Sequence, residues 1–401
     1  MCGIVGIVEQ DLNRPVAPAD LERMVRTLVH RGPDDEGTIT LPGVALGMRR
    51  LAIVDLATGQ QPILNETGDI KVVANGEIYN FRDIQRELEQ HGHRFRSRHS
   101  DIEVLVHAYE QWGEGFLARL RGMFALALWD GRTRTLIAAR DRAGEKPLYW
   151  TQTAEGVRLA SEVKALLVRP EVSRELDPIA LDQFLTYEYV LAPRTMLKGV
   201  HKLPPAHFLR YRDGHATVHR YWDAAAVPLR AWTDGEAAEA LRAALTRAVI
   251  SQLMAEVPLG AFLSGGIDSS SIVALMSEAS SQQVNSFSIG FSDGTYNELP
   301  YAREVAALFS TNHRERQASP DLGDMFERLV VHLDEPFADV SLFPTFSVSE
   351  LAREHVKCVL SGDGGDELFG GYDAYQAQAL AMRFSRMGET LWPAAAAVAA
   401  A

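Results

Sequence analysis

The chain changes its hydrophobic pattern near Thr233, and this change limits what it can fold into. Before Thr233, short apolar segments come in blocks with few helices between them. After it, apolar runs at 257–263, 284–289 and 356–360 alternate with helical segments. Blocks of strands predict packed antiparallel sheets with helices outside, and regular alternation predicts a doubly wound parallel sheet. We therefore expect an α+β domain of layers α-β-β-α, followed by an α/β domain.

The same patterns predict the domain boundaries. Residues 1–189 form the first predicted domain. Residues 190–232 contain several prolines and no sustained period, which is typical of a crossing between domains. Thr233–Glu236 has the capping-box pattern of a helix start, so residues 233–401 form the second predicted domain.

Composition excludes several classes of protein. The net charge of -13 argues against a nucleic-acid or anionic-membrane surface, because phosphate binding needs clustered Lys and Arg. No stretch approaches the roughly 18 apolar residues of a membrane span, and no secretion signal opens the chain. Cys2 and Cys358 give no disulfide framework. Because the Cys2 thiol must stay reduced, we expect a cytoplasmic protein.

The segment Met1–Ile7 places a cysteine directly after the initiator methionine. Removal of Met1 would leave Cys2 with both a thiol nucleophile and a free α-amino group. The unperturbed pKa of such an amine is about 8, so it can act as a base near neutral pH. The alternative is that Cys2 only begins a buried strand, since free cysteines usually behave as small hydrophobic residues.

Two glycine-rich loops in the second half each follow an apolar run. Leu263–Ser270 leads into a helix, whose N-terminal NH groups and dipole favour an anion such as pyrophosphate. This loop lacks the Lys of a Walker A motif. Ser361–Glu367 follows another apolar run, and ligands bind where such strands end. Asp268 and Asp366 could share one Mg²⁺, although both loops are also compatible with plain turns.

Seven segments, taken together, resemble a known family. They are Met1–Ile7, His30–Asp34, Arg50–Asp55, Asn75–Asn80, Arg121–Ala125, Leu263–Ser270 and Ser361–Glu367. In this order, and over nearly the whole chain, they resemble glutamine-hydrolysing asparagine synthases, which are class II glutamine amidotransferases. With Gly59–Pro62 and Leu368–Tyr372, the chain is most similar to the branch of exosortase-associated amidotransferases.

The resemblance implies an N-terminal nucleophile glutaminase domain in which Cys2 attacks the side-chain amide of glutamine. Asn75 and Gly76 match the donors to the oxyanion. Arg50 matches the residue that holds the α-carboxylate of glutamine, and Glu77 and Asp101 match the acids that bind its α-amino group. The backbone of Leu51, Ala52, Ile53 and Val54 would line the pocket.

The resemblance also implies an adenylating domain of the PP-loop type that binds ATP and Mg²⁺. The residues expected to contact ATP are Leu263, Ser264, Gly265, Gly266, Asp268, Ser269, Ser270, Ile289, Ser361, Gly362 and Asp363. Asp268 and Asp366 would hold Mg²⁺. Asp363 departs from the Glu that the family often has there. Family members also extend beyond Ala401 and carry a catalytic lysine there, so we expect a chain incomplete at its C-terminus.

The expected enzyme is a ligase that transfers the ammonia of glutamine to a carboxylate activated by ATP, aspartate being the first choice. The alternatives are an exopolysaccharide-linked carboxylate, a β-lactam-synthetase-like cyclase and a non-catalytic regulatory module. The cyclase alternative does not need a glutaminase site, yet the sequence keeps the glutaminase residues Cys2, Arg50, Asn75 and Asp101. The expected partners are the small substrates, with no nucleic acid and no membrane, and a homodimer is possible.

Overall fold

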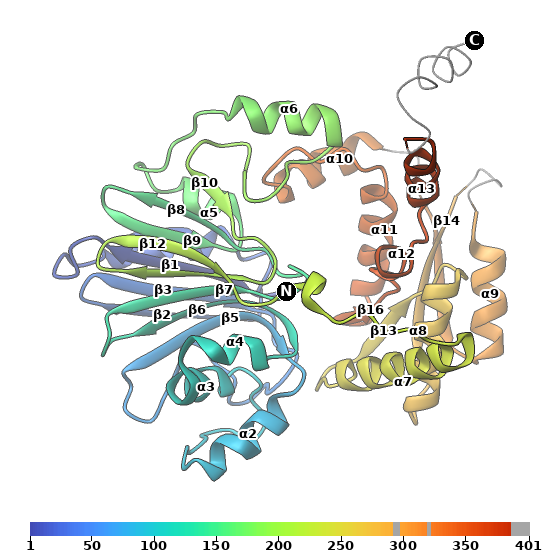
Figure 1. Cartoon of the computed structure of the whole chain (residues 1–401), viewed down its shortest axis with the longest axis horizontal. Coiled ribbons are helices and arrows are strands. Elements are labelled where there is room, and N and C mark those ends of the chain that lie inside the picture. The colour runs from blue at the N-terminus through green and yellow to red at the C-terminus, as the bar shows by residue number, and fades with distance from the viewer. Residues whose placement is uncertain (292–296, 319–321, 386–401) are drawn as a thin grey trace. The chain divides into compact units, whose positions relative to one another are not determined.

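The computed structural model describes residues 1–291, 297–318 and 322–385 (Figure 1). The chain divides into two compact units. The first comprises Met1–Pro258 and Ser319–Thr345, and the second comprises Leu259–Ala318 and Phe346–Ala401. The last part of the second predicted domain, 386–401, lies outside the described residues.

Two antiparallel sheets lie at the centre of the first unit. In its described residues each sheet has six strands, in the orders β10-β8-β9-β1-β3-β2 and β12-β11-β7-β6-β5-β4. The first sheet consists of β1 (Gly3–Glu9), β2 (Asp35–Leu41), β3 (Val44–Arg50), β8 (Tyr149–Thr153), β9 (Gly156–Ala160) and β10 (Val200–Lys202). The second consists of β4 (Ile63–Leu64), β5 (Ile70–Ile78), β6 (Gly122–Asp130), β7 (Thr135–Arg140), β11 (His207–Arg212) and β12 (His215–Arg220).

Alternation along β1 shows how the layers pack. Ile4 and Val8 lie in a core with residues of the second sheet such as Val73, whereas Val5 and Ile7 lie in a different core. Successive strand residues point to opposite faces, so one strand serves both cores. The second core is closed by α1 (Pro18–Arg26) and α5 (Val163–Leu167).

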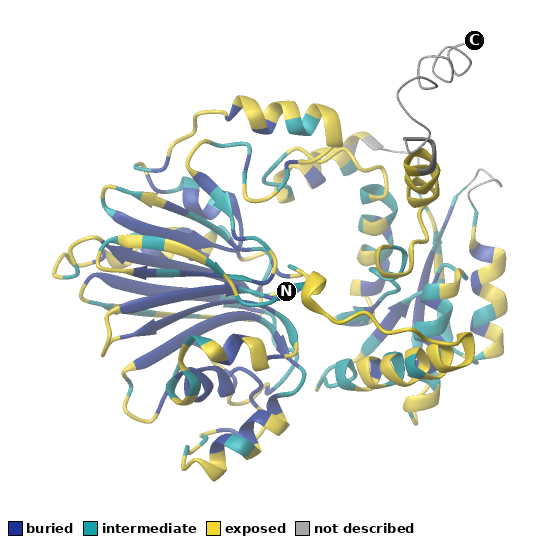
Figure 2. Cartoon of the chain, in the orientation of Figure 1, coloured by how far each residue is buried: buried dark blue, intermediate teal, exposed yellow. Residues whose placement is uncertain are grey.

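A third core lies on the outer face of the second sheet. It contains buried residues of α2 (Phe81–Gln90), α3 (Val104–Trp112) and α4 (Phe116–Arg119). Figure 2 shows the buried strands between helices whose outer faces are exposed. The predicted α-β-β-α sandwich is therefore confirmed. The other helices of this unit are α6 (Pro178–Tyr187), α7 (Asp234–Gln252) and α10 (Leu322–His332), with short 3-10 turns at Gly113–Gly115 and Ala224–Ala226.

The segment 190–232 differs from the expected crossing between domains. It contains β10, β11 and β12, which pair with each other or with β7 and β8 of the sandwich. Phe208, Leu209 and Tyr211 of β11 are buried. The outer strand β12 is mostly exposed and polar, so the sequence there lacks the apolar pattern that would predict a strand. The expected helix start at Thr233 is confirmed, because Thr233 and Glu236 form a complete capping box.

The second unit contains a parallel sheet in the order β15-β14-β13-β16. Its strands are β13 (Leu259–Phe262), β14 (Asn285–Gly290), β15 (Asn312–Gln317) and β16 (Cys358–Leu360). The helices are α8 (Ile267–Ala279), α9 (Leu299–Leu308), α11 (Leu342–Arg353), α12 (Gly365–Phe369) and α13 (Asp373–Ser385). The strand order runs outward from β13 to β15 and then reverses to β16, which confirms the predicted doubly wound sheet.

Candidate active sites

Cys2 directly precedes β1, and its thiol lies against the loop that follows β3. The backbone NH of Leu51 donates to Sγ at 3.4 Å, and Sγ lies 3.7 Å from the carbonyl oxygen of Leu51. Arg31 Nε donates to the carbonyl oxygen of Cys2 at 2.9 Å and fixes the residue's backbone. Residues 51–54 form a loop outside the strands, and the backbone NH of Ala52 donates to Asp34 Oδ2 at 3.0 Å.

Burial raises the pKa of the Cys2 thiol, and this effect outweighs the opposing Leu51 hydrogen bond, the amino terminus, Arg50 and Arg31. A thiol that stays protonated near neutral pH is a poor nucleophile. A nucleophilic thiol here would need a base within reach; the amino terminus whose charge lowers its pKa in this chain is that of Met1.

Asn75 supplies a buried donor that has no partner within the described residues. Its side chain is 1% exposed, and Nδ2 makes no hydrogen bond. Leaving such a donor unsatisfied costs roughly 1–3 kcal/mol. Such a donor in a buried position calls for an acceptor from outside the chain, such as a bound ligand or water.

Gly76 follows Asn75 on β5, and only glycine fits there. Its φ is +152°, and a Cβ would lie 2.0 Å from the carbonyl oxygen of Met123 on β6. The sequence pair Asn75-Gly76 indicated positive φ correctly, although the strand continues through it.

Two buried carboxylates come next along the chain. Burial raises the pKa of Glu77, with Lys146 and the amino terminus opposing. Burial also raises the pKa of Asp101 to about 7, and the charges of Glu77 and Asp55 add to this rise. The backbone NH of Ile78 donates to Asp101 Oδ2 at 2.9 Å and lowers the pKa. A cation placed between Glu77 and Asp101 would relieve their mutual repulsion.

Arg50 lies at the end of β3 and is buried. Its Nη2 donates to the carbonyl oxygens of Val54 at 3.1 Å and Asp55 at 2.7 Å. Gly59 allows this approach, because a Cβ there would lie 2.5 Å from Nη2. The guanidinium is therefore held in one orientation beside the loop 51–54, as a carboxylate clamp requires.

Sequence reasoning missed two residues that shape this site. Lys146 is buried, with its Nζ 3.7 Å from Met1 Sδ, and Asp141 fixes its loop by accepting the backbone NH of Lys146 at 3.0 Å. Glu256 accepts the backbone NH of Asp55 at 3.0 Å, and its own NH donates to Ile53 at 2.9 Å. Lys146 follows Glu145 in a charged segment and Glu256 lies in no recognisable motif, so neither position carried a local sequence signal.

The second unit has a pocket of about 390 Å³ where β13 and β16 end. Its lining includes seven predicted residues: Ser264, Asp268, Ser269, Ser361, Gly362, Asp363 and Asp366. Phe262, Gly364, Glu367 and Tyr372 also line it and were not predicted. The two loops meet because β13 and β16 are neighbours at the point where the strand order reverses, which is where ligands bind in such sheets.

Close backbone contacts hold the two loops together. A Cβ on Gly365 would lie 2.3 Å from Asp268 Oδ2, and a Cβ on Gly362 would lie 2.8 Å from the backbone N of Ser269. Within the first loop, the hydroxyls of Ser264 and Ser269 lie 2.9 Å apart. The glycines therefore let the start of α12 approach the start of α8.

The other residues predicted to contact ATP do not line this pocket. Gly265 and Gly266 lie in the first loop, and Gly265 has φ +85°. Ser270 is on α8, and its buried hydroxyl has no partner in the described residues. Leu263 is buried and Ile289 half-buried, at the ends of β13 and β14; neither is among the residues that line the pocket.

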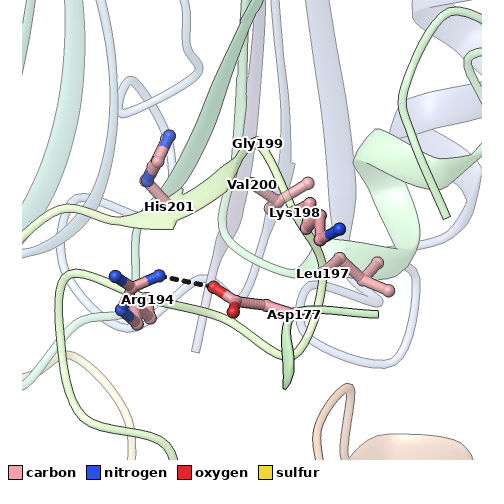
Figure 3. Close-up of a pocket in the computed structure, with 7 residues that line it drawn as sticks. All are labelled: Asp177, Arg194, Leu197, Lys198, Gly199, Val200 and His201. Carbon is pink, nitrogen blue, oxygen red and sulfur yellow. Dashed lines mark hydrogen bonds and ion pairs between the residues drawn. The ribbon is translucent and has the colours of Figure 1, made fainter. Parts of the chain in front are cut away.

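Figure 3 shows another pocket, of about 270 Å³, in the first unit. It is lined by Asp177, Arg194 and the residues 197–201. Arg194 Nη1 and Asp177 Oδ2 form an ion pair at 2.6 Å across it. None of the predicted site residues lines this pocket.

Two family models match successive parts of the chain, with bounds that differ from those of the two compact units. A glutamine amidotransferase domain matches residues 1–222, and an asparagine synthase domain matches residues 240–400. Asparagine synthetase [glutamine-hydrolyzing] 1 of Bacillus subtilis is 36% identical over 394 residues, which are 96% of this chain and 61% of that protein.

Two further relatives carry related names. A candidate glutamine-hydrolysing asparagine synthetase of Methanocaldococcus jannaschii is 32% identical over 396 residues, 93% of this chain and 76% of that protein. Asparagine synthetase [glutamine-hydrolyzing] 2 of Arabidopsis thaliana is 35% identical over 390 residues, 93% of this chain and 61% of that protein.

The fold and the domain match define a protein with a class II glutamine amidotransferase domain. The chain belongs to the family of glutamine-hydrolysing asparagine synthetases. It spans about three fifths of the length of the Bacillus subtilis and Arabidopsis relatives. Among the residues described, none of the helices has the length and apolar character needed to cross a membrane.

Proposed function

We propose that the first unit hydrolyses glutamine at Cys2. After removal of Met1, the α-amino group of Cys2 takes the thiol proton as sulfur attacks the amide carbon. The oxygen that becomes negative is bound by Asn75 Nδ2 and the NH of Gly76. The same amine then gives its proton to the amide nitrogen, which leaves as ammonia as the C–N bond breaks, and water hydrolyses the thioester to glutamate and the free Cys2 thiol. The observation that carries this proposal is the buried, unpartnered amide of Asn75 beside Gly76.

We propose that the ends of glutamine are held by opposite charges. Arg50 binds the α-carboxylate, and the raised pKa values of Glu77 and Asp101 reflect a space built to accept the α-ammonium. The loop 51–54 lines the pocket and is fixed from outside by Glu256.

Glutamine binding is expected to weaken as the pH falls through 7. Asp101, with a pKa of about 7, must be ionised to pair with the ammonium of glutamine, and protonation removes that attraction. Because binding then competes with one proton, the dissociation constant should rise about tenfold from pH 8 to pH 6. Calorimetry on the Cys2→Ala variant measures binding without turnover. Asp101→Asn should bind weakly with a flat profile, and an unchanged slope in that variant would assign the pH dependence to another group.

We propose that the pocket between β13 and β16 binds ATP. The NH groups at the start of α8 and the paired glycines suit the phosphates. Asp268 and Asp366 line the same pocket, and carboxylate oxygens fit Mg²⁺, which prefers one or two carboxylates together with substrate phosphates. Bound there, Mg²⁺ would neutralise phosphate charge. Leu263 and Ile289 would flank the adenine and ribose from the strand ends.

Replacing either acid is expected to weaken nucleotide binding. Asp268→Asn or Asp366→Asn should lower the affinity for ATP in the presence of Mg²⁺ by at least about tenfold, because one charged oxygen ligand is lost. In EDTA the variants should differ little from the parent. Asp373→Asn, at the exposed start of α13, is the matched control. Equal losses with and without Mg²⁺ would contradict a metal role for these acids.

For the whole protein we propose glutamine-dependent amidation of a carboxylate, aspartate first, through an acyl-adenylate. The reducing cytoplasm is the proposed setting, and a homodimer is a proposed assembly. The deciding experiment supplies ATP, Mg²⁺, glutamine and candidate acceptors, including aspartate and uronic acids, to the protein. Glutamate, AMP and pyrophosphate should appear together. ADP in place of AMP, or a product formed without glutamine or ammonia, would refute this reaction; the latter would indicate a cyclase.

A further inference from the structure

Four metal-binding side chains meet in the first unit, apart from the residues assigned above. Glu66 lies between β4 and β5, His93 follows α2, and His107 and Glu110 lie one turn apart on α3. One donor atom from each lies within 4.8 Å of the others. We propose that this cluster binds one divalent transition-metal ion, of which Zn²⁺ is the type.

The environment of His107 points to a missing partner. The side chain is 1% exposed, and neither ring nitrogen makes a hydrogen bond within the described part of the chain. Nδ1 lies 3.2 Å from Glu66 Oε2, but without hydrogen-bond geometry. A buried imidazole without a partner is costly. A protonated ring would need two aligned acceptors, whereas a neutral ring that binds a metal through one nitrogen needs an acceptor only for the NH of the other.

The polar side chains beside His93 and His107 lie at different distances from the two rings. His93 Nε2 lies 3.3 Å from Gln111 Oε1, which can accept an NH from this nitrogen. The lone pair of Nδ1 is then available to bind a metal, and Nδ1 lies 3.7 Å from Glu66 Oε1. His107 Nε2 lies 3.7 Å from Glu103 Oε1, a buried carboxylate that also accepts the NH groups of Arg96 and Ser97. A hydrogen-bond partner behind a ligating histidine fixes its tautomer and ring position, and Gln111 can do this for His93, whereas Glu103 is near His107 without a hydrogen bond.

The donor set selects the class of metal. Two imidazole nitrogens and two carboxylate oxygens suit Zn²⁺, Co²⁺ or Ni²⁺, whereas Mg²⁺ and Ca²⁺ prefer oxygen ligands alone. Glu66 would bring one negative charge to a divalent ion, whereas the charge of Glu110 is shared with Arg132 in an ion pair. Glu110 is already oriented by Asn65 Nδ2 at 3.0 Å and Arg132 Nη1 at 3.0 Å.

The site would tie together segments that are distant in sequence. Glu66 and His93 come from loops, and α3 supplies the other two ligands, so the ion closes the chain between residues 66 and 110. Ligands that bind only the folded state stabilise it. The ion is therefore structural, and its binding does not depend on the proposed reaction at Cys2.

The test uses the whole chain without a histidine tag, stripped by a chelator and then titrated with Zn²⁺ or Co²⁺. We expect one ion per chain by elemental analysis after dialysis, visible Co²⁺ bands of a site with nitrogen ligands, and a higher Tm with Zn²⁺. His93→Gln and the exposed Glu66→Gln should each lower the affinity at least about tenfold. Both variants should keep the Tm of the metal-free parent within a few degrees.

His91→Gln is the matched control, since His91 is exposed and lies two residues from His93. It should bind the ion as the parent does. No retained ion in the parent, or equal binding by the parent and by His93→Gln and Glu66→Gln, would overturn the proposal. In the first case, a pH-dependent Tm lost in Glu66→Gln would instead assign the cluster to a buried histidine–glutamate ion pair.

Discussion

Replacing Cys2 with alanine should reduce glutamine hydrolysis by at least about 10⁴-fold, because no other group can form the thioester. Glutamine should still bind, since Arg50, Glu77 and Asp101 are unchanged. The measurement is glutamate release under saturating glutamine, together with calorimetric binding. The parent should also label with a glutamine-analogue alkylator at Cys2 alone.

The control for this prediction is Cys358→Ala, which removes the other cysteine and should leave hydrolysis unchanged. Intact mass spectrometry of the active parent should show a chain without Met1. An active protein that retains Met1, or residual hydrolysis in Cys2→Ala above a hundredth of the parent rate, would contradict the assignment of nucleophile and base to one residue.

Asn75→Ala is expected to lower kcat for glutamine hydrolysis by about 10²- to 10³-fold, with a much smaller change in KM. The Nδ2 donor has no partner within the described residues of the free protein, so its loss removes an interaction made mainly with the charged oxygen of the reaction. Stability should change little, because no hydrogen bond of that nitrogen is broken. Steady-state kinetics and thermal unfolding check both points.

Asn13→Ala, at an exposed turn, serves as the matched substitution and should be silent. A rise in KM with kcat preserved in Asn75→Ala would show that Asn75 binds the ground state of glutamine, and the oxyanion donor would then have to be sought elsewhere.

Apolar periodicity predicted the elements that pack on both faces. Strands β13 and β14 follow this rule, and both were expected from the apolar runs at 257–263 and 284–289. The strand β15 (Asn312–Gln317) carries almost only polar side chains, because it lies at the edge of the sheet with one neighbour. Its pairing with β14 could not be read from its residues.

The candidate sites were predictable where a motif is contiguous. Asn75-Gly76 and Leu263–Ser270 each carry their chemistry within a few residues, so the sequence shows them directly. The cluster of Glu66, His93, His107 and Glu110 assembles from separate loops and one helix, and no local spacing reveals it. The apolar side chains of residues 51–54 do not reveal that their backbone contacts Cys2 and Glu256, so this part of the site could not be read from the sequence.

The pairing of β13 with β16 also affects the order in which parts of the chain can fold during synthesis. The two loops that line the proposed nucleotide pocket are separated by about a hundred residues of sequence, so Ser361–Glu367 is synthesised well after Leu263–Ser270. Domains generally fold as units during synthesis, N-terminal first. The sandwich that carries Cys2 can therefore fold on the nascent chain while the first phosphate loop still waits for its counterpart.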